Sequence, residues 1–234
     1  MKIHIHKLLK LAALSVVLAV FAGLTACGGE EAASRLVVGP AKDLLVPNDM
    51  QYQQGFVVQV TDKEGNPAPA TIVSVEMVPV RYFKGQYQGF DSSGDGDADE
   101  WRLNYSVSCE AEDANHNGVL DEGEDINGNG TLQPTNPATL AQHPSETPTF
   151  TPGTEKIITD DSGFGYFSVT YPASQALWSR MRITVSANVQ GTENREQYEF
   201  TLFVLLNDIS NFPIAPPGGA DSPYGIAASC SDPL

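Results

Sequence analysis

Alternation of apolar and polar residues with a period of two is the feature that most limits how this chain can fold. Phe56, Val58 and Val60 alternate with Val57, Gln59 and Thr61. The same rhythm returns in segments 73–77, 101–109, 167–171, 181–189 and 198–204. Strands that bury one face of an antiparallel sheet show this pattern. We therefore predict a chain built almost entirely from short antiparallel strands.

Turn-forming residues lie between the predicted strands. Gly-Asn-Pro occupies 65–67, Asp-Ser-Gly occupies 161–163 and Gly-Thr-Glu-Asn occupies 191–194. These residues favour the backbone angles of tight turns. The only helix that the pattern predicts is a turn or two over 173–178. Seven or more strands without a βαβ rhythm predict an all-β, antiparallel β-sandwich.

Two segments resemble bacterial immunoglobulin-like (Ig-like) repeats. Residues 60–73 read V-T-D-K-E-G-N-P-A-P-A-T-I-V, similar to a strand–turn–strand of those repeats. Residues 158–167 read I-T-D-D-S-G-F-G-Y-F, similar to a hairpin of invasin-type and collagen-adhesin-B-type modules. The resemblance covers residues 36–207 and implies an Ig-like sandwich, to which we assign residues 36–211. A long insertion, about residues 85–155, separates the two signatures and departs from the ordinary repeat.

The insertion contains the spacing of a twelve-residue calcium loop. Residues 113–124 read D-A-N-H-N-G-V-L-D-E-G-E. Gly118 stands at position 6, where such a loop turns sharply, and Val119 would offer its carbonyl at position 7. Oxygen-bearing side chains stand at positions 1, 3, 5, 9 and 12: Asp113, Asn115, Asn117, Asp121 and Glu124. Calcium is the cation that this donor set fits, because it takes six to eight hard oxygen ligands.

A second loop starts at the next residue. Its predicted ligands are Asp125, Asn127, Asn129 and Thr131, with glycine again at position 6. A repeat of twelve residues leaves no room for the helices of an EF-hand pair, so the tandem resembles the compact calcium repeats of thrombospondin type 3 or dockerin-like modules. The second loop is weaker, because Gln133 and Asn136 carry no charge at positions 9 and 12. The alternative interpretation of 113–136 is a solvated Asn/Gly/Asp-rich loop.

Residues 91–99, D-S-S-G-D-G-D-A-D, have part of the same pattern. Oxygens stand at positions 1, 3, 5 and 9, but Arg102 takes position 12, where a carboxylate belongs. This segment is either a third, partial calcium site or a solvated acidic turn.

Acidic residues are concentrated in the same region. Of 29 acids in the chain, 12 lie between Asp91 and Asp125, and Arg102 is the only base there. This concentration indicates cations as partners and argues against nucleic acid. It also implies that bound metal is needed to hold the insertion together.

The first residues indicate export and lipid anchoring. Lys2, Lys7 and Lys10 precede an apolar stretch, 11–24, which is too short for an ordinary membrane span. Leu-Thr-Ala-Cys at 24–27 then resembles the bacterial lipobox. The resemblance implies removal of residues 1–26, acylation of Cys27, a tether at 27–35, and, with glycine next to the cysteine, the outer membrane of a Gram-negative cell envelope. The alternative is an ordinary signal peptide.

Two cysteines remain after Cys27. In an oxidising compartment an even pair is expected to be bonded, so we predict a disulfide between Cys109 and Cys230. The bond would hold the Pro/Gly-rich tail, residues 212–234, beside the start of the calcium loops.

No catalytic motif appears: the sequence has no G-x-S-x-G or H-E-x-x-H, and we expect neither an enzyme nor a small-molecule substrate. The favoured interpretation is a non-enzymatic, calcium-stabilised Ig-like envelope lipoprotein that acts in adhesion or surface assembly. The alternative is a carbohydrate- or peptide-binding module whose contact surface is the acidic insertion. Tyr87, Phe90 and Phe150 are the aromatics that could stack on such a ligand, or anchor the loops instead.

Overall fold

The computed structural model describes residues 33–144, 146–147 and 149–234, so the predicted lipidation at Cys27 lies outside the described residues. The all-β prediction is confirmed. Within this part of the chain no helix is long and apolar enough to span a membrane. The strands are β1 (Arg35–Asn48), β2 (Gln51–Thr61), β3 (Ile72–Phe90), β4 (Glu100–Glu110), β5 (Thr139–Ala141), β6 (Phe150–Thr151), β7 (Lys156–Ile158), β8 (Phe164–Pro172), β9 (Ser179–Val189) and β10 (Thr192–Thr201).

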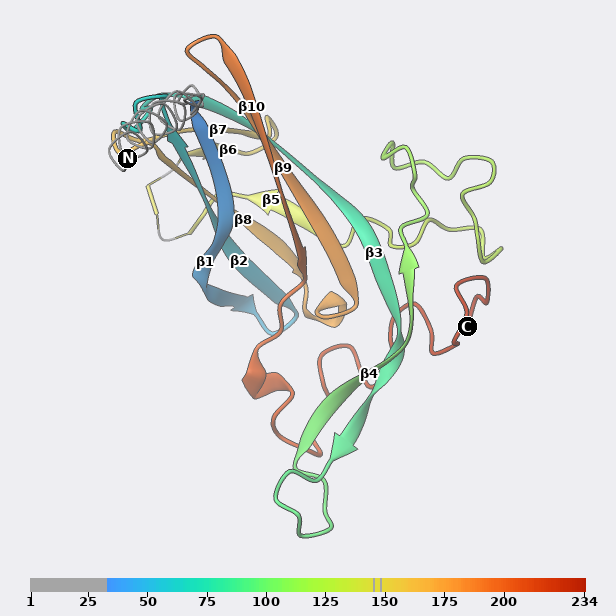
Figure 1. Ribbon diagram of the computed structural model, residues 1–234. Coiled ribbons are helices and arrows are strands. Elements are labelled where there is room, and N and C mark those ends of the chain that lie inside the picture. The colour runs from blue at the N-terminus through green and yellow to red at the C-terminus, as the bar shows by residue number, and fades with distance from the viewer. Residues whose placement is uncertain (1–32, 145, 148) are drawn as a thin grey trace, which may run out of the picture. The chain divides into compact units, whose positions relative to one another are not determined.

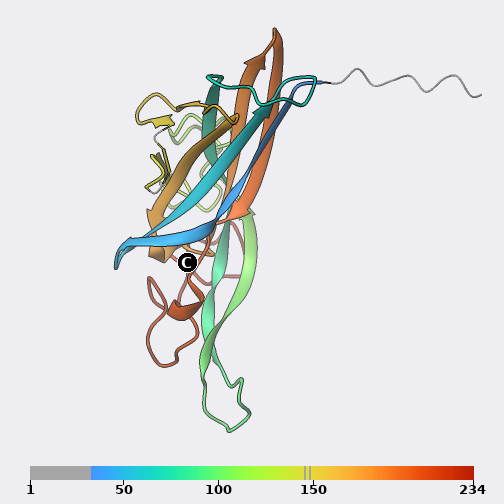
Figure 2. The ribbon, with the colours of Figure 1, turned by 90° about the vertical axis from the view of Figure 1, so that its left-hand side faces the viewer.

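The strands form two antiparallel sheets (Figures 1 and 2). One sheet has the order β1-β2-β8-β5 and the other has the order β10-β9-β3-β7-β6, with β4 paired to β3 off this path. When β4, β6 and β7 are set aside, the remaining strands in chain order occupy positions A to G. The sheets then read A-B-E-D and G-F-C, which is the strand arrangement of an Ig sandwich. The predicted Ig-like β-sandwich is therefore confirmed.

Side chains from alternate positions of both sheets form the main core. Phe56 and Phe167, which pair across β2 and β8, are both fully buried, with ring centroids 5.4 Å apart. Phe200 of β10 closes over Phe56 from the other sheet, at 4.9 Å between ring centroids. Burial of each such side chain contributes roughly 1.5–3 kcal/mol. The period-two pattern of the sequence thus corresponds to one continuous apolar layer between the sheets.

Strand β3 extends well beyond the sandwich. Its first part pairs with β9 through Tyr82, and its distal part, residues 81–90, pairs with β4 in a long hairpin (Figure 1). The register shifts at Lys84 and Gly85, where the glycine has φ +146° and a Cβ would lie 2.2 Å from the carbonyl oxygen of Asn104. A smaller apolar cluster lies along the hairpin: Tyr82, Tyr87, Cys109, Trp178 and Tyr224.

The C-terminal tail covers the free edge of this distal part of β3. The backbone N–H of Tyr87 donates to Ala220 at 2.7 Å, and that of Gly85 donates to Gly225 at 3.0 Å. The indole N–H of Trp101 donates to the carbonyl of Ile214 at 2.6 Å. The tail is therefore held by main-chain pairing as well as by its cysteine, more than its sparse apolar content led us to expect.

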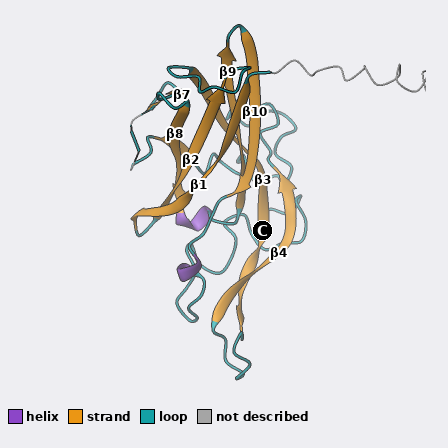
Figure 3. Cartoon of the chain, turned by 60° about the vertical axis from the view of Figure 1, so that its left-hand side comes forward, coloured by secondary structure: helices purple, strands orange, loops and turns teal. Residues whose placement is uncertain are grey.

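Two sequence expectations differ from the structure. The helix expected over 173–178 is only the 3-10 turn η1 (Ala173–Gln175), because Ala176 is already extended with ψ 133°. Figure 3 shows how small this element and the second turn, η2 (Leu206–Asp208), are beside the strands. In addition, the region taken as an insertion contains β5, which pairs with β8 inside the sandwich.

Candidate metal centre in two paired loops

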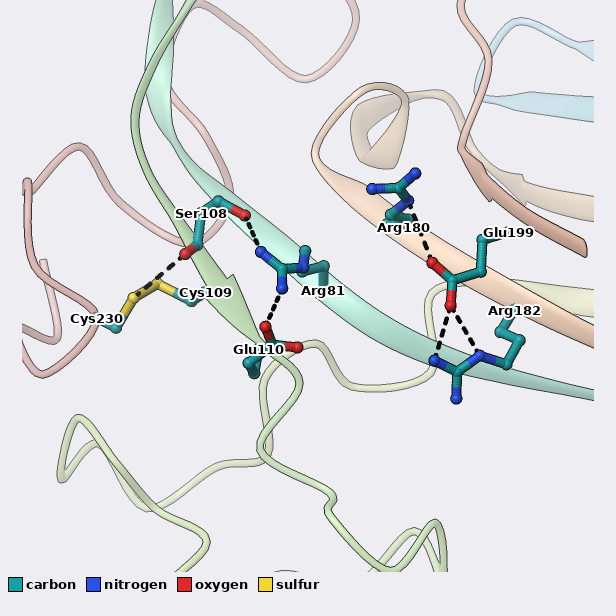
Figure 4. Close-up of polar contacts among 8 residues, drawn as sticks. All are labelled: Arg81, Ser108, Cys109, Glu110, Arg180, Arg182, Glu199 and Cys230. Atoms are coloured by element: carbon teal, nitrogen blue, oxygen red, sulfur yellow. Dashed lines mark hydrogen bonds and ion pairs between the residues drawn. A yellow bond between two sulfur atoms is a disulfide. The ribbon is translucent and has the colours of Figure 1, made fainter.

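The predicted calcium loops leave β4 beside the tail. The predicted disulfide between Cys109 and Cys230 is confirmed, with Cα atoms 5.6 Å apart (Figure 4). Arg81 of β3 forms an ion pair with Glu110 and donates to the Ser108 hydroxyl at 3.1 Å. The chain therefore enters the loops from a strand end that is fixed on both sides.

The first loop is closed by hydrogen bonds between its own residues. Asp113 at position 1 accepts the backbone N–H of Asn117 through Oδ1 at 3.0 Å and that of Gly118 through Oδ2 at 2.8 Å. Asn117 at position 5 accepts the N–H of Val119 at 2.7 Å. These bonds curl the backbone so that side chains 113, 115 and 117 lie on the inside of one turn.

The second loop repeats these bonds twelve residues later. Asp125 accepts the N–H groups of Asn129 and Gly130 at 3.0 and 2.9 Å, and Asn129 accepts that of Thr131 at 2.8 Å. Positions 4 and 6 have left-handed backbone in both loops: His116 and Gly118 in the first, at φ 60° and 74°, and Gly128 and Gly130 in the second, at φ 71° and 77°. The two segments are thus structural repeats as well as sequence repeats.

The side chain at position 9 makes an equivalent contact in each loop. Oδ2 of Asp121 accepts the side-chain amide N–H groups of Asn115 and Asn117, each at 2.8 Å. These two bonds lower the pKa of Asp121. In the second loop Gln133 accepts the amide of Asn127 at 2.8 Å. Side chains at positions 3 and 9 therefore meet in each loop.

The carboxylate at position 12 comes from within the first loop but from outside the second. Glu124 accepts the N–H of Ala114 at position 2 and of Asp121 at position 9 of the first loop, both at 3.0 Å. Its counterpart in the second loop is Glu112, which precedes the first loop and accepts the N–H of Ile126 at 3.3 Å and of Gln133 at 2.9 Å. Those are positions 2 and 9 of the second loop. Asn136, which counting along the chain puts at position 12, makes no such bond to the described residues of either loop.

Glu112 was not among the residues expected from the sequence. The signal that would have found it is the dipeptide Glu-Asp, which stands at 112–113 and again at 124–125, so that the repeat begins with the glutamate. Counting ligands forward from Asp125 cannot identify a side chain that comes before Asp113.

The carboxylates of Glu112 and Glu124 are both buried. Glu112 is 2% exposed and Glu124 is 9% exposed. Burial raises the pKa of Glu112, while backbone N–H donors led by that of Gln133 act in the opposite direction. None of the ion pairs formed by residues 33–144, 146–147 and 149–234 includes either carboxylate. A buried carboxylate without a cation is costly unless its charge is compensated.

The donor set fits calcium better than any softer metal. Carboxylates, side-chain amides and a main-chain carbonyl are hard oxygen donors, and cysteine and histidine ligands are missing from the set. In the described part of the chain, no three Asp, Glu, His or Cys side chains converge as a ready-made metal cluster. Asn115 and Asn117 turn their amide nitrogens toward Asp121. Rotation of each amide would present oxygen in place of nitrogen.

The segment 91–99 forms the tip of the β3–β4 hairpin and shares part of this geometry. Asp91 accepts the N–H of Gly96 at 2.8 Å, as position 1 does from position 6 in the other loops. Asp99 accepts the N–H groups of Ser92 and Ser93 at 2.9 and 2.8 Å. Arg102, at position 12, instead forms an ion pair with Glu100 and lies 3.1 Å from the ring centroid of Phe90.

The aromatics considered for ligand stacking are mostly inside the molecule. Tyr87 is 4% exposed and packs against Trp178, with ring centroids 5.4 Å apart. Phe150 is 5% exposed and belongs to the main core. Phe90 is the most exposed of the three, and Arg102 covers its ring. Tyr87 and Phe150 are therefore anchors of the fold.

Comparisons with known proteins give no family for this chain. No family model matches it, and no curated protein matches it with significance. Among solved structures, the GAE domain of yeast GGA1 is 7% identical, with 71% of this chain and 90% of that chain covered and a TM-score of 0.27. The GAE domain of GGA2p from Saccharomyces cerevisiae is 8% identical, with 74% and 92% covered and a TM-score of 0.25.

MtrC from Shewanella baltica OS185 is 15% identical, with 78% of this chain but 23% of that chain covered and a TM-score of 0.22. These TM-scores are too low for the likenesses to support any argument. The assignment of the fold rests on the strand order.

Proposed function

We propose that this chain is a non-enzymatic, calcium-stabilised Ig-like module of the cell envelope, anchored by lipid on Cys27, that serves adhesion or surface assembly. The observation that carries the proposal is the pair of equivalent loops with oxygen donors at the calcium-ligand spacing. Two buried carboxylates in these loops form no ion pair with a cationic side chain among the described residues. Bound calcium supplies the missing positive charge.

The location of the loops explains why a metal there stabilises the whole domain. The loops lie between β4 and β5, so they connect the hairpin to a strand of the sandwich. The N–H of Glu112 donates to the carbonyl of Gln133 at 2.8 Å and closes the base of the paired loops. An ion that fixes both loops therefore restrains the chain on both sides.

The test is thermal unfolding of the purified chain in chelator and in millimolar calcium. At a free calcium concentration about one hundred times the dissociation constant, linkage contributes ~2.7 kcal/mol. For a domain of this size that corresponds to a rise of roughly 5–11 °C in Tm. An equal Tm in chelator and calcium contradicts the proposal.

Two variants make the test specific. Asp113→Ala is expected to remove most of the calcium-dependent rise in Tm, because it deletes position 1 of the first loop. Asp161→Ala is the matched control, since it removes the same charge from an exposed turn in the connection between β7 and β8. Similar losses in both variants would mean that calcium acts only by screening the acidic surface.

The alternative, a carbohydrate- or peptide-binding module, has less support. Tyr87 and Phe150, two of the three aromatics that would stack on a ligand, are buried. A glycan array on the calcium-saturated chain provides the direct measurement, and specific binding would favour this alternative.

A further inference from the structure

We propose that Glu112 is the bidentate carboxylate ligand of the second calcium ion, so that each loop completes its site with the glutamate that precedes the other loop. The inference rests on the proposed calcium function and adds a ligand from outside the second loop. It also replaces Asn136, the residue that counting along the sequence puts at position 12.

The first argument is geometric equivalence. Glu124 accepts N–H groups from positions 2 and 9 of the first loop, and Glu112 accepts N–H groups from positions 2 and 9 of the second. Both glutamates use one carboxylate oxygen for each bond. Because the position-1 and position-5 bonds are also equivalent in the two loops, Glu112 has the place relative to Asp125 that Glu124 has relative to Asp113.

The second argument is charge. Glu112 is 2% exposed, and its partners in the described structure are backbone N–H groups with no positive side chain among them. Each carboxylate oxygen has about two acceptor sites, so Glu112 keeps acceptor capacity beside the backbone N–H groups of Ile126, Asn127 and Gln133. A divalent cation in the second loop would use this remaining capacity and compensate the buried charge.

The core of the hairpin supports this position. Glu112 and Asn127 both lie close to the buried Tyr82 hydroxyl, which shares a hydrogen bond with the Asn127 side chain. Tyr82 belongs to the hairpin cluster. The second site therefore lies against strand β3, which contains Tyr82. The first loop is joined to the second through Glu124, which directly precedes Asp125.

The positions of Glu112 and Glu124 in the chain also link the two sites. Glu112 comes directly before the first ligand of loop one, and Glu124 directly before the first ligand of loop two. Fixing either glutamate on an ion therefore positions the first aspartate of the other loop. We expect the two ions to bind with positive cooperativity.

The experiment is calcium titration by calorimetry and ion counting by native mass spectrometry on the detergent-solubilised full chain. Glu112→Gln is expected to bind one ion fewer than the parent, or to bind its second ion at least 10- to 100-fold more weakly, the range for losing a metal-site partner. Glu112→Asp keeps the buried charge but shortens its reach, and it is expected to fold and to show the same weakening.

The controls are Asn136→Ala and Glu110→Gln, and both are expected to bind as the parent does. Glu110 is the last residue of β4, two positions before Glu112, but its side chain is exposed and forms an ion pair with Arg81. Parent-like titration of both Glu112 variants overturns the inference, as does loss of the second ion in Asn136→Ala. A parent chain that binds no calcium refutes the proposed function itself, which is a different result.

Discussion

Removal of the disulfide should destabilise the chain strongly while leaving the tail in place. The bond joins Cys109 to Cys230, residues separated by 121 positions. In the chain-entropy account, closing a loop of that length contributes about 4–5 kcal/mol, because it restricts the unfolded chain. The tail, in contrast, keeps its main-chain bonds from Ala220 and Gly225 to β3 in the folded state. Cys230→Ser is therefore expected to lower stability by about 4–5 kcal/mol, or roughly 8–20 °C in Tm.

The assay is urea unfolding in saturating calcium, followed by tryptophan fluorescence. Both tryptophans report on the hairpin: Trp178 is buried in its cluster and Trp101 packs against Phe212 of the tail, with ring centroids 4.6 Å apart. The native emission of Cys230→Ser should match the parent, because neither contact depends on the bond. A loss of stability below about 1 kcal/mol in a parent shown to be fully oxidised would refute the entropic reasoning. A shifted native emission would show that the tail depends on the cysteine.

Three further predictions concern the loops and the anchor. Gly118→Ala should lower the free energy of unfolding by about 1–2 kcal/mol, because the backbone at Gly118 is left-handed with φ 74°. His116→Gly should be tolerated, because glycine adopts φ 60° without strain. Urea unfolding in calcium measures both variants, and equal losses of stability would contradict the backbone argument. Asp95→Ala should reduce the number of bound ions by one in native mass spectra if the hairpin tip holds calcium, and an unchanged count means that the tip is only a turn. Cys27→Ala should abolish fatty-acid labelling and move the protein to the soluble fraction, and retention in membranes would indicate an uncleaved signal segment.

The strands of the sandwich could be predicted because burial of one face imposes a period of two, and that period is readable in residues such as Phe56, Val58 and Val60. The same reading fails at the bulge of β3. Lys84 and Gly85 shift the register, so the buried side chains change parity between Tyr82 and Tyr87. Alternation followed across this bulge therefore cannot show that Tyr87 is buried.

Other features had no residue pattern to reveal them. The tail pairs with β3 through main-chain groups of Gly85, Ala220 and Gly225, and such bonds leave no alternation in the sequence. The internal hydrogen bonds of the first loop join residues close in the sequence, whereas its predicted role as a calcium site stays a prediction. Glu112 lies outside the loop that it completes, so its place depends on how the two loops pack together.

The long β3 strand also bears on solubility. Its distal half has β4 on one edge, and on the other edge Gly85 and Tyr87 donate their N–H groups to the tail, while Phe83 donates to Trp178. If the loops loosen and the Cys109–Cys230 bond is also reduced, β4 can fray from its loop end and uncover the pairing groups of β3 beside Tyr82. Exposed edges of this kind recruit strands from other molecules. Prolonged chelation under reducing conditions during purification is therefore expected to produce aggregates built on the hairpin, while the sandwich remains folded.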